Sequence, residues 1–141
     1  MAVLKVRTIQ WIRFPPNWDG PEIDEVKWIS VEKLEVSWQL DTYYVGPDGT
    51  RNAISGRYEK FGRWLTLGEP VWMATVALND DGEISFTDGR HRFAWLRDHG
   101  LLALPMQVPP DQAEMIATRF GTSSRISLIP VADSSGPISE V

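Results

Sequence analysis

The chain has 141 residues, a formal net charge of −5, two histidines and no cysteine. The missing cysteine excludes disulfides, zinc–thiolate sites and thiol chemistry, and two histidines are too few for an ordinary structural metal site, which leaves a carboxylate-held magnesium as the metal to consider. The acidic balance argues against a general nucleic-acid coat but is compatible with one local cationic pocket.

The N-terminal part of the chain predicts two strands separated by a loop. Residues 4–14 are rich in β-branched and aromatic side chains, and the proline-rich residues 15–21 can only be loop. Residues 26–31 predict a second strand, followed by a single helical turn at 32–35. Since the start of the chain lacks the apolar core of a secretion signal, and no apolar run reaches the roughly 18 residues of a membrane span, we expect a cytoplasmic protein.

A turn at residues 45–50 precedes an amphipathic helix. Within residues 52–67, apolar side chains recur at helical spacing: Ile54, Tyr58, Phe61 and Leu65. This stripe predicts a helix that packs one face against the core.

A second face of the same helix combines two cations with an aromatic ring. Arg57, Lys60 and Trp64 are spaced i, i+3 and i+7, so they fall on one side of the helix. Two interpretations stay open: a cationic edge beside an aromatic ring, or a solvated face around the core stripe. Gly56 and Gly62 weaken the helix by roughly 1 kcal/mol each relative to alanine.

A hairpin then leads into the helix that carries the main motif. Residues 71–78 and 83–86 predict strands, and the Asn-Asp-Asp-Gly sequence at 79–82 is a strong turn signal. The following helix places Phe93, Ala94 and Leu96 on one face and is predicted to end at Gly100.

The start of this helix has the residue types of an anion site. Asp88 is predicted to cap it, Gly89 permits close backbone approach, and Arg90, His91 and Arg92 follow. A helix N-terminus attracts anions, and two arginines there oppose the macrodipole unless an anion is bound. The alternative is that the arginines point to solvent and pair with carboxylates.

The C-terminal part predicts one short strand, one helix and a tail. Residues 104–108 predict a strand, in which Pro105 favours an edge or a strand start. Residues 110–121 predict a helix with an acidic cap. The serine-rich residues 122–141 are expected to be weakly ordered, so residues 1–121 form the domain. The fold class is α+β, with a small mixed sheet and flanking helices.

The element order over residues 26–109, with its Asp-Gly-Arg-His-Arg helix start, resembles the ParB/sulfiredoxin superfamily, which includes the ParB-like nucleases. Members carry an Asp-Gly-x-His-Arg type of signature at the start of a helix that follows a hairpin. The resemblance implies a helix start that binds the phosphates of ATP or CTP, with magnesium as a candidate cofactor. Some members hydrolyse nucleotides, phosphorylate a small substrate or cleave DNA.

The resemblance also assigns roles by position. Gly89 would approach the phosphates, and His91 and Arg92 would contact them. Arg90 stands where sulfiredoxin has its catalytic cysteine, which rules out sulfiredoxin chemistry. The residues after Pro109 are too few for the DNA-reading domain of a partitioning protein. Among small stand-alone members, the chain is most similar to the plasmid fertility-inhibition (Osa-like) group, which blocks conjugative transfer.

The first functional hypothesis is a phosphohydrolase, either an ATPase or a DNase. Arg57, Arg90 and Arg92 would stabilise phosphoryl charge. The base would be Asp88, or else His91 or a metal-bound water.

Glu59 and Glu69 are weaker candidates for the general base of such a phosphohydrolase.

The second hypothesis is a non-catalytic inhibitor or adaptor that binds a protein of a conjugation or secretion system through exposed tryptophans. Most of the seven tryptophans are nevertheless expected in the core. Sequence-specific DNA binding is disfavoured by the net charge.

Overall fold

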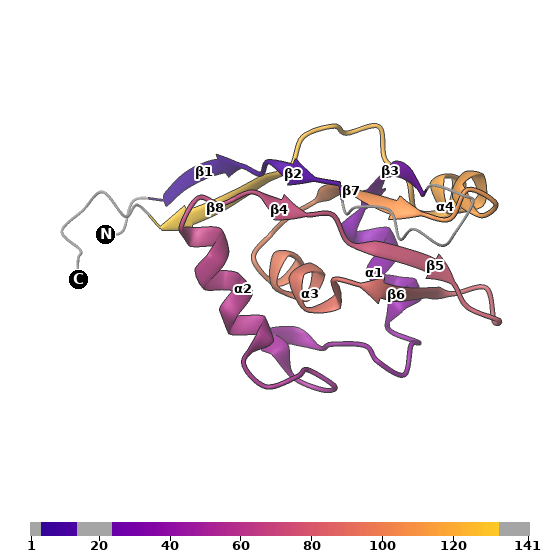
Figure 1. The fold of residues 1–141 in the computed structure, drawn as a ribbon, viewed down its shortest axis with the longest axis horizontal. Coiled ribbons are helices and arrows are strands. Elements are labelled where there is room, and N and C mark those ends of the chain that lie inside the picture. Colours follow the sequence, from indigo (N-terminus) through magenta and orange to yellow (C-terminus); the bar gives the residue numbers. More distant parts are fainter. Residues whose placement is uncertain (1–3, 14–23, 133–141) are drawn as a thin grey trace.

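The computed structural model describes residues 4–13 and 24–132, and the side chains from 8 to 129 within them. Both strands and helices occur along these residues (Figure 1). Their bounds are, in chain order, β1 (Leu4–Thr8), β2 (Trp11–Ile12), β3 (Glu25–Ser30), α1 (Val31–Trp38), the 3₁₀ turn η1 (Pro47–Gly49), α2 (Arg57–Thr66), β4 (Val71–Trp72), β5 (Thr75–Leu78), β6 (Ile84–Asp88), α3 (Arg90–Asp98), β7 (Ala103–Val108), α4 (Ala113–Phe120) and β8 (Leu128–Ala132).

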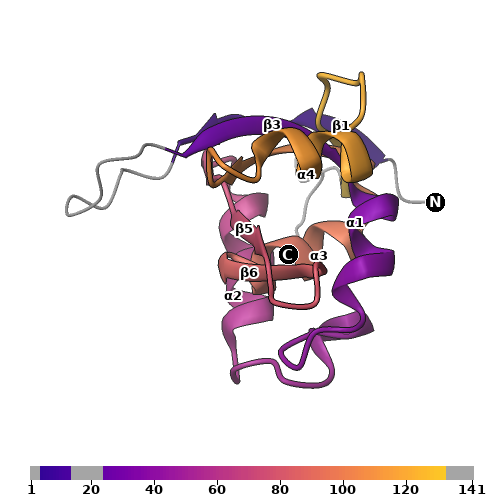
Figure 2. The same ribbon diagram turned by 90° about the vertical axis from the view of Figure 1, so that its right-hand side faces the viewer.

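The sheet is mixed, as predicted. Its strand order is β3-β7-β5-β6, in which β3 and β7 are antiparallel, β7 and β5 parallel, and β5 and β6 antiparallel. Two further pairs, antiparallel β1–β8 and parallel β2–β4, complete the described strands. Helix α3 lies between α1 and α2 (Figure 2). The predicted α+β class is confirmed.

The N-terminal segment is two strands, β1 and β2, instead of the single strand predicted over residues 4–14. The break at residues 9 and 10 lets the two halves pair with different partners: Thr8 with Leu128 on β8, and Trp11 with Val71 on β4. The loop predicted at 15–21 lies outside the described residues.

Helix α1 is longer than the single turn predicted at residues 32–35. Ser30 caps it, because its Oγ accepts a hydrogen bond from the Lys33 N–H at 3.3 Å. Val31, Leu34 and Trp38 are all buried, at a spacing of three and four residues. The apolar residues after 35 therefore continue a helical face.

Helix α2 begins at Arg57, five residues later than predicted. Gly56 adopts a left-handed conformation with φ +83° just before it, which sets the start. Ile54 consequently lies outside the helix and is 45% exposed, so its predicted place in the apolar stripe was wrong. Tyr58, Phe61 and Leu65 are buried as predicted.

Gly62 lies where α2 meets α3, and its replacement by alanine is expected to destabilise the protein. A Cβ at this position would stand 2.4 Å from Nε1 of Trp95, an indole that is only 9% exposed. Overpacking of this kind costs about 1–3 kcal/mol. Helix propensity alone predicts the opposite, a gain of roughly 1 kcal/mol. Urea unfolding of Gly62→Ala, with Glu59→Ala on the exposed face as control, separates the two; a stabilised Gly62→Ala would contradict the close packing.

Strand β7 is central, so the predicted edge position of Pro105 was wrong. The Gln107 N–H donates to Ala74 O at 2.9 Å, on the side of β7 that faces β5. Pro105 faces the same side, because residues two apart along a strand point their N–H groups alike. Strand β5 begins at Thr75, which pairs with Gln107, so no ladder bond is needed at Pro105.

Helix α4 is present as predicted, but its acidic cap is not. Gln112 occupies the N-cap position without a side-chain capping bond. Its Oε1 instead accepts a hydrogen bond from the Leu78 N–H at 2.8 Å, which ties α4 to β5. Gly121 follows the last helical residue.

The segment expected to be weakly ordered contains strand β8. Ser127, just before it, is 2% exposed, and its Oγ donates to Ala103 O at 2.8 Å. Ile129 is fully buried. The sequence did not predict this strand because serines and prolines surround its short apolar run. Residues 133–141 lie outside the described residues.

An aromatic cluster forms the centre of the core. Trp38 makes ring contacts with Tyr44, Phe86 and Phe93 at centroid distances of 4.8, 4.7 and 5.5 Å. The expectation that most tryptophans are core residues was wrong for the described ones. Only Trp38 and Trp95 are buried. Two of the others, Trp11 and Trp28, are half-buried, and Trp64 and Trp72 are exposed.

Candidate phosphate-binding site

Gly89 joins β6 to α3 in a geometry that only glycine tolerates. Its φ is +93°, and an added Cβ would lie 2.8 Å from both the Ala74 Cβ and the Arg92 Nη2. The backbone at the start of α3 is thus placed close to β5, and the first turn of the helix presents N–H groups that have no partner within the helix.

Asp88 is the last residue of β6 and does not cap α3, so the predicted cap was wrong. The N-cap position belongs to Gly89, which makes no side-chain capping bond. The Asp88 carboxylate instead accepts a hydrogen bond from Arg92 Nη2 at 2.7 Å, an i, i+4 ion pair. The alternative that the arginines pair with carboxylates therefore holds for Arg92.

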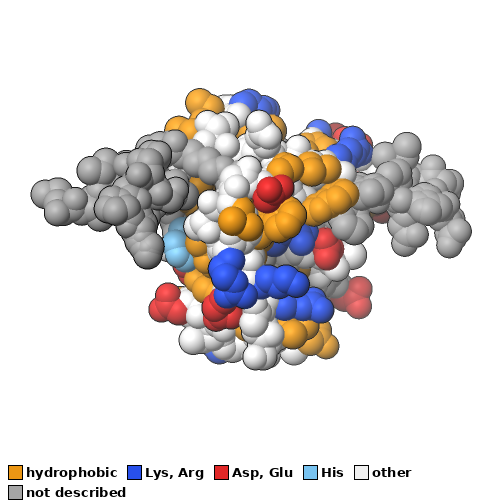
Figure 3. Space-filling view, turned by 60° about the vertical axis from the view of Figure 1, so that its left-hand side comes forward, with side chains coloured by type: hydrophobic (Ala, Val, Ile, Leu, Met, Phe, Trp, Pro, Cys, Tyr) orange, Lys and Arg blue, Asp and Glu red, His pale blue; other side chains and the backbone are white. Residues whose placement is uncertain are grey.

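A pocket of about 740 Å³ opens between α2 and the start of α3. Figure 3 shows Lys and Arg side chains gathered next to an apolar patch on the side of the molecule where α2 lies. The lining combines four cations, one carboxylate, one imidazole and an apolar wall: Arg57, Lys60, Phe61, Arg63, Trp64, Leu67, Val71, Trp72, Asp88, Gly89, His91 and Arg92.

The cationic edge predicted on α2 is part of this pocket. Arg57 and Lys60 line it together with Arg92 of α3. Trp64 is 43% exposed and its Nε1 donates to Pro70 O at 3.0 Å, which fixes the orientation of the indole. The structure therefore favours the cationic edge with an aromatic neighbour over a merely solvated face.

His91 is buried and already hydrogen-bonded. Its ring is 8% exposed, and Nε2 accepts a hydrogen bond from the Ile54 N–H at 2.8 Å. Burial, followed by the charges of Arg90, Arg57 and Arg92, lowers the pKa of His91 to about 4. The ring is therefore neutral at pH 7, with its proton on Nδ1, because Nε2 acts as an acceptor.

Arg90 does not line the pocket, unlike the other residues of the motif. Its Nη2 donates to Asn52 O at 3.3 Å and its guanidinium lies 5.8 Å from the ring centre of Tyr43. Glu59 and Glu69 are not among the lining residues either. Over residues 4–13 and 24–132, no group of three or more His, Asp and Glu side chains could hold a metal ion.

Several lining residues, among them Arg63, Leu67 and Trp72, were missed by the sequence interpretation. Arg63 follows Lys60 on α2, at a spacing of three residues that could have revealed it. Leu67 and Trp72 lie beyond the helix, and Trp72 is brought to the pocket by β4. No local pattern predicts that placement, since it depends on the pairing of β4 with β2.

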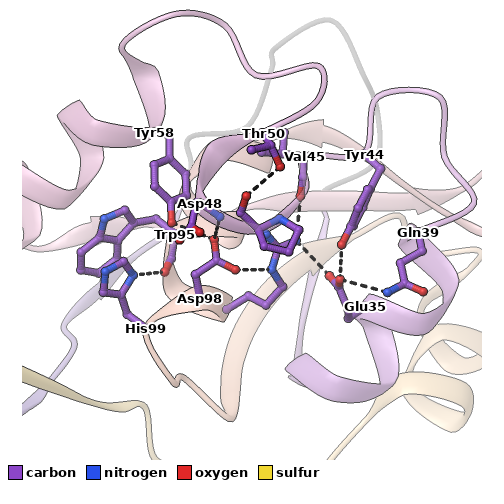
Figure 4. A network of polar contacts seen from close by, with 12 residues as sticks. Glu35, Gln39, Tyr44, Val45, Asp48, Thr50, Tyr58, Trp95, Asp98 and His99 are labelled. Carbon is purple, nitrogen blue, oxygen red and sulfur yellow. Dashed lines mark hydrogen bonds and ion pairs between the residues drawn. The ribbon is translucent and has the colours of Figure 1, made fainter.

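The opposite end of α3 carries a polar network that the sequence did not indicate (Figure 4). Arg97 contacts Glu35 at 3.1 Å, Asp98 at 2.9 Å and Val45 O at 2.7 Å. Asp98 also accepts hydrogen bonds from Tyr58 Oη at 2.7 Å and from the Asp48 N–H at 2.8 Å. The network joins α1, α2, α3 and η1 and so holds the walls of the pocket in place.

Comparison with known proteins agrees with the resemblance found in the sequence. Residues 66–121 match the family model described as Plasmid Fertility inhibition factor, a segment that includes Asp88 to Arg92 but not the cations of α2. The predicted resemblance to the plasmid fertility inhibition factors is confirmed. Within the described ranges, none of the helices combines the length and hydropathy of a membrane span.

A solved fertility inhibition factor has the same fold. It is the oncogenic suppression activity protein, determined as a gold(I) cyanide derivative, and the likeness has a TM-score of 0.57 at 19% sequence identity. The alignment covers 79% of this chain and 62% of that protein, so the chain spans less than two thirds of its length. No curated protein gives a significant sequence match.

Proposed function

We propose that this protein acts in plasmid fertility inhibition and that its pocket binds the phosphate groups of a nucleotide, ATP or CTP. The observation that carries the proposal is the convergence of four cations, Arg57, Lys60, Arg63 and Arg92, on the start of α3 in a chain whose net charge is −5. One carboxylate, Asp88, shares the pocket. Such a local cationic surplus in an acidic protein suits an anionic ligand.

The backbone and the side chains favour the same ligand. The start of α3 supplies unpaired N–H groups and the positive end of the helix macrodipole. A phosphate at this point gains hydrogen bonds from the helix and charge-assisted bonds from guanidinium groups such as Arg92. It would also relieve the repulsion between the macrodipole and the arginines of the first turn.

The apolar wall of the pocket supports a nucleotide over inorganic phosphate. Trp64 and Trp72 are 43% and 38% exposed and line the pocket beside the cations. An indole face offers a stacking surface for a planar base. A nucleotide fits both parts of the site, its phosphates at the cations and its base on the indole faces. We also infer a cytoplasmic location, where nucleotides are abundant.

Hydrolysis is the finer proposal, and Asp88 would be its central residue. It is the one carboxylate in the pocket lining, where it could hold a nucleotide-bound magnesium ion or activate a water. His91 is poorly suited to that task because its Nε2 is occupied by the Ile54 N–H. An ATPase or DNase would therefore lose turnover in Asp88→Asn while binding is kept.

The exposed apolar residues of the pocket also favour a second candidate, a non-catalytic adaptor. Leu67 is 73% exposed next to Trp64 and Trp72, and tryptophan and arginine are the residue types that most often dominate protein interfaces. The partner would be a protein of a transfer or secretion system. Absence of nucleotide binding would favour this candidate.

The test is calorimetric titration of the protein with ATP and with CTP, each with magnesium. We expect saturable binding, and a loss of affinity of about tenfold or more in Arg57→Gln/Lys60→Gln, since each charge-assisted bond contributes more than 1 kcal/mol. Arg125→Gln, which changes an exposed cation outside both the lining and the loop before α2, is the matched control. Wild-type protein that binds neither nucleotide would refute the proposal, and equal affinity in the double variant would place the site elsewhere.

A further inference from the structure

We infer that His91 is a positioning residue that holds the loop before α2 and thereby places Arg57 at the pocket. The inference rests on the proposed function of that pocket. It assigns to His91 a role different from phosphate contact. The observation behind it is the hydrogen bond from the Ile54 N–H to Nε2, at 2.8 Å, made by a ring that is 8% exposed.

The loop transmits this contact directly to Arg57. The Arg57 N–H donates to Ile54 O at 3.1 Å, so the residue that His91 holds is itself bonded to the first residue of α2. Gly56, with φ +83°, turns the chain between them. Displacement of Ile54 would therefore move the start of α2 and the guanidinium that it carries.

The same loop is strained and depends on support from outside. Arg51 and Asn52 have φ values of +57° and +56°, in the left-handed region that costs non-glycine residues energy. Asn52 is held through its carbonyl oxygen, which accepts from Arg90 Nη2 at 3.3 Å, and through its Nδ2, which donates to Tyr44 O at 3.0 Å. Arg90 and His91, adjacent on α3, thus fasten two points of one loop.

The electrostatic surroundings keep the imidazole in the form that the contact requires. Arg90 and Arg92 flank it on α3, and Arg57 faces it from α2. These cations and burial disfavour a protonated ring, and a protonated ring could not accept the bond from Ile54. The pocket's own cations therefore favour the loop contact that positions one of them.

Two substitutions test the inference through ligand affinity. His91→Phe keeps a buried ring but removes the acceptor, whereas His91→Gln keeps an acceptor oxygen. We expect His91→Phe to weaken magnesium–ATP binding by about the same factor as Arg57→Gln, and His91→Gln to recover most of it. The double variant His91→Phe/Arg57→Gln should bind no more weakly than Arg57→Gln alone. Independent losses that multiply would mean that His91 contacts the ligand itself, and would overturn the inference.

A measurement on the wild-type protein without ligand gives an independent answer. ¹H–¹⁵N spectra should show His91 neutral at pH 7 with its proton on Nδ1, and slow exchange of the Ile54 amide that becomes at least about tenfold faster in His91→Phe. A proton on Nε2, or an unprotected Ile54 amide in wild type, would overturn the inference even if His91→Phe fails to fold. If magnesium–ATP does not bind to wild type, the proposed function fails. The spectra then still decide whether His91 holds the loop, through the shift of the Arg57 amide in the two variants.

Discussion

Replacement of Arg97 by methionine is expected to lower the free energy of unfolding by about 3–5 kcal/mol, the range for removing one partner of a buried ion pair. The Arg97 side chain is 10% exposed and bonds both the Glu35 and the Asp98 carboxylates. Methionine fills a similar volume but leaves two carboxylates without their cation. The loss would then come from uncompensated charge and not from a cavity.

The surroundings of Asp98 explain why the loss should be large. Burial raises the pKa of Asp98, but hydrogen bonds from Arg97, from Tyr58 and from the Asp48 N–H outweigh it and hold the pKa below its usual value. Without Arg97 the burial cost remains and its main compensation is gone. The loop before η1 also loses the hydrogen bond that Val45 O accepts from Arg97.

Urea unfolding followed by circular dichroism measures the effect. Arg125→Met is the control, because Arg125 is exposed and a surface change of this kind is usually within about 0.5 kcal/mol. A loss below about 1 kcal/mol for Arg97→Met would mean that the network behaves like a solvated surface pair. Arg97→Lys keeps the positive charge but loses the bidentate guanidinium, so its loss in free energy of unfolding should lie between those of Arg125→Met and Arg97→Met.

The elements predicted correctly are those defined by local signals. The hairpin of β5 and β6 follows from its Asn-Asp-Asp-Gly turn, although the single strand predicted over residues 71–78 is split into β4, which pairs with β2, and β5. Helix α3 follows from its apolar face and its end before Gly100. In each case the deciding residues lie within a few positions of one another, so period and turn chemistry are sufficient.

The elements that were missed depend on partners far along the chain. Strand β8 forms because β1 pairs with it across more than 100 residues, and Pro105 is accepted in a central strand because β5 begins beyond it. The composition of residues 122–132 does not predict the pairing of β8 with β1. Tertiary context decided both cases, as it does for strands in general.

The candidate site shows the same division. The motif at Asp88 to Arg92 and two cations of α2, Arg57 and Lys60, were predicted from the sequence, and all of them except Arg90 meet in one pocket because α2 contacts α3. The direction of each side chain was not visible. Asp88 pairs with Arg92 in place of capping, and Arg90 turns to Asn52, because neighbouring elements offer these groups closer partners.

The buried His91 is expected to make the stability of the protein fall on mild acidification. The folded-state pKa of about 4 lies below the ordinary value of 6.5, so between these pH values the unfolded state binds a proton that the folded state does not. Stability from this group is complete above pH 6.5 and is lost as the pH falls toward 4. At 1.36 kcal/mol per pKa unit, the loss amounts to about 3 kcal/mol.

The free energy of unfolding of wild type and of His91→Phe, measured in urea from pH 7.5 to pH 4, isolates this contribution. Carboxylates titrate in the same range, but their effect is common to both proteins and cancels in the difference. We expect the difference to shrink by about 3 kcal/mol over that window, because His91→Phe has no imidazole to protonate in the unfolded state. The same titration of His99→Phe, which removes the other histidine, shows whether the pH dependence of the free energy of unfolding comes from His91 or from His99. Parallel curves for wild type and His91→Phe would show that His91 is not held neutral, and would remove the physical basis for its bond to the Ile54 amide.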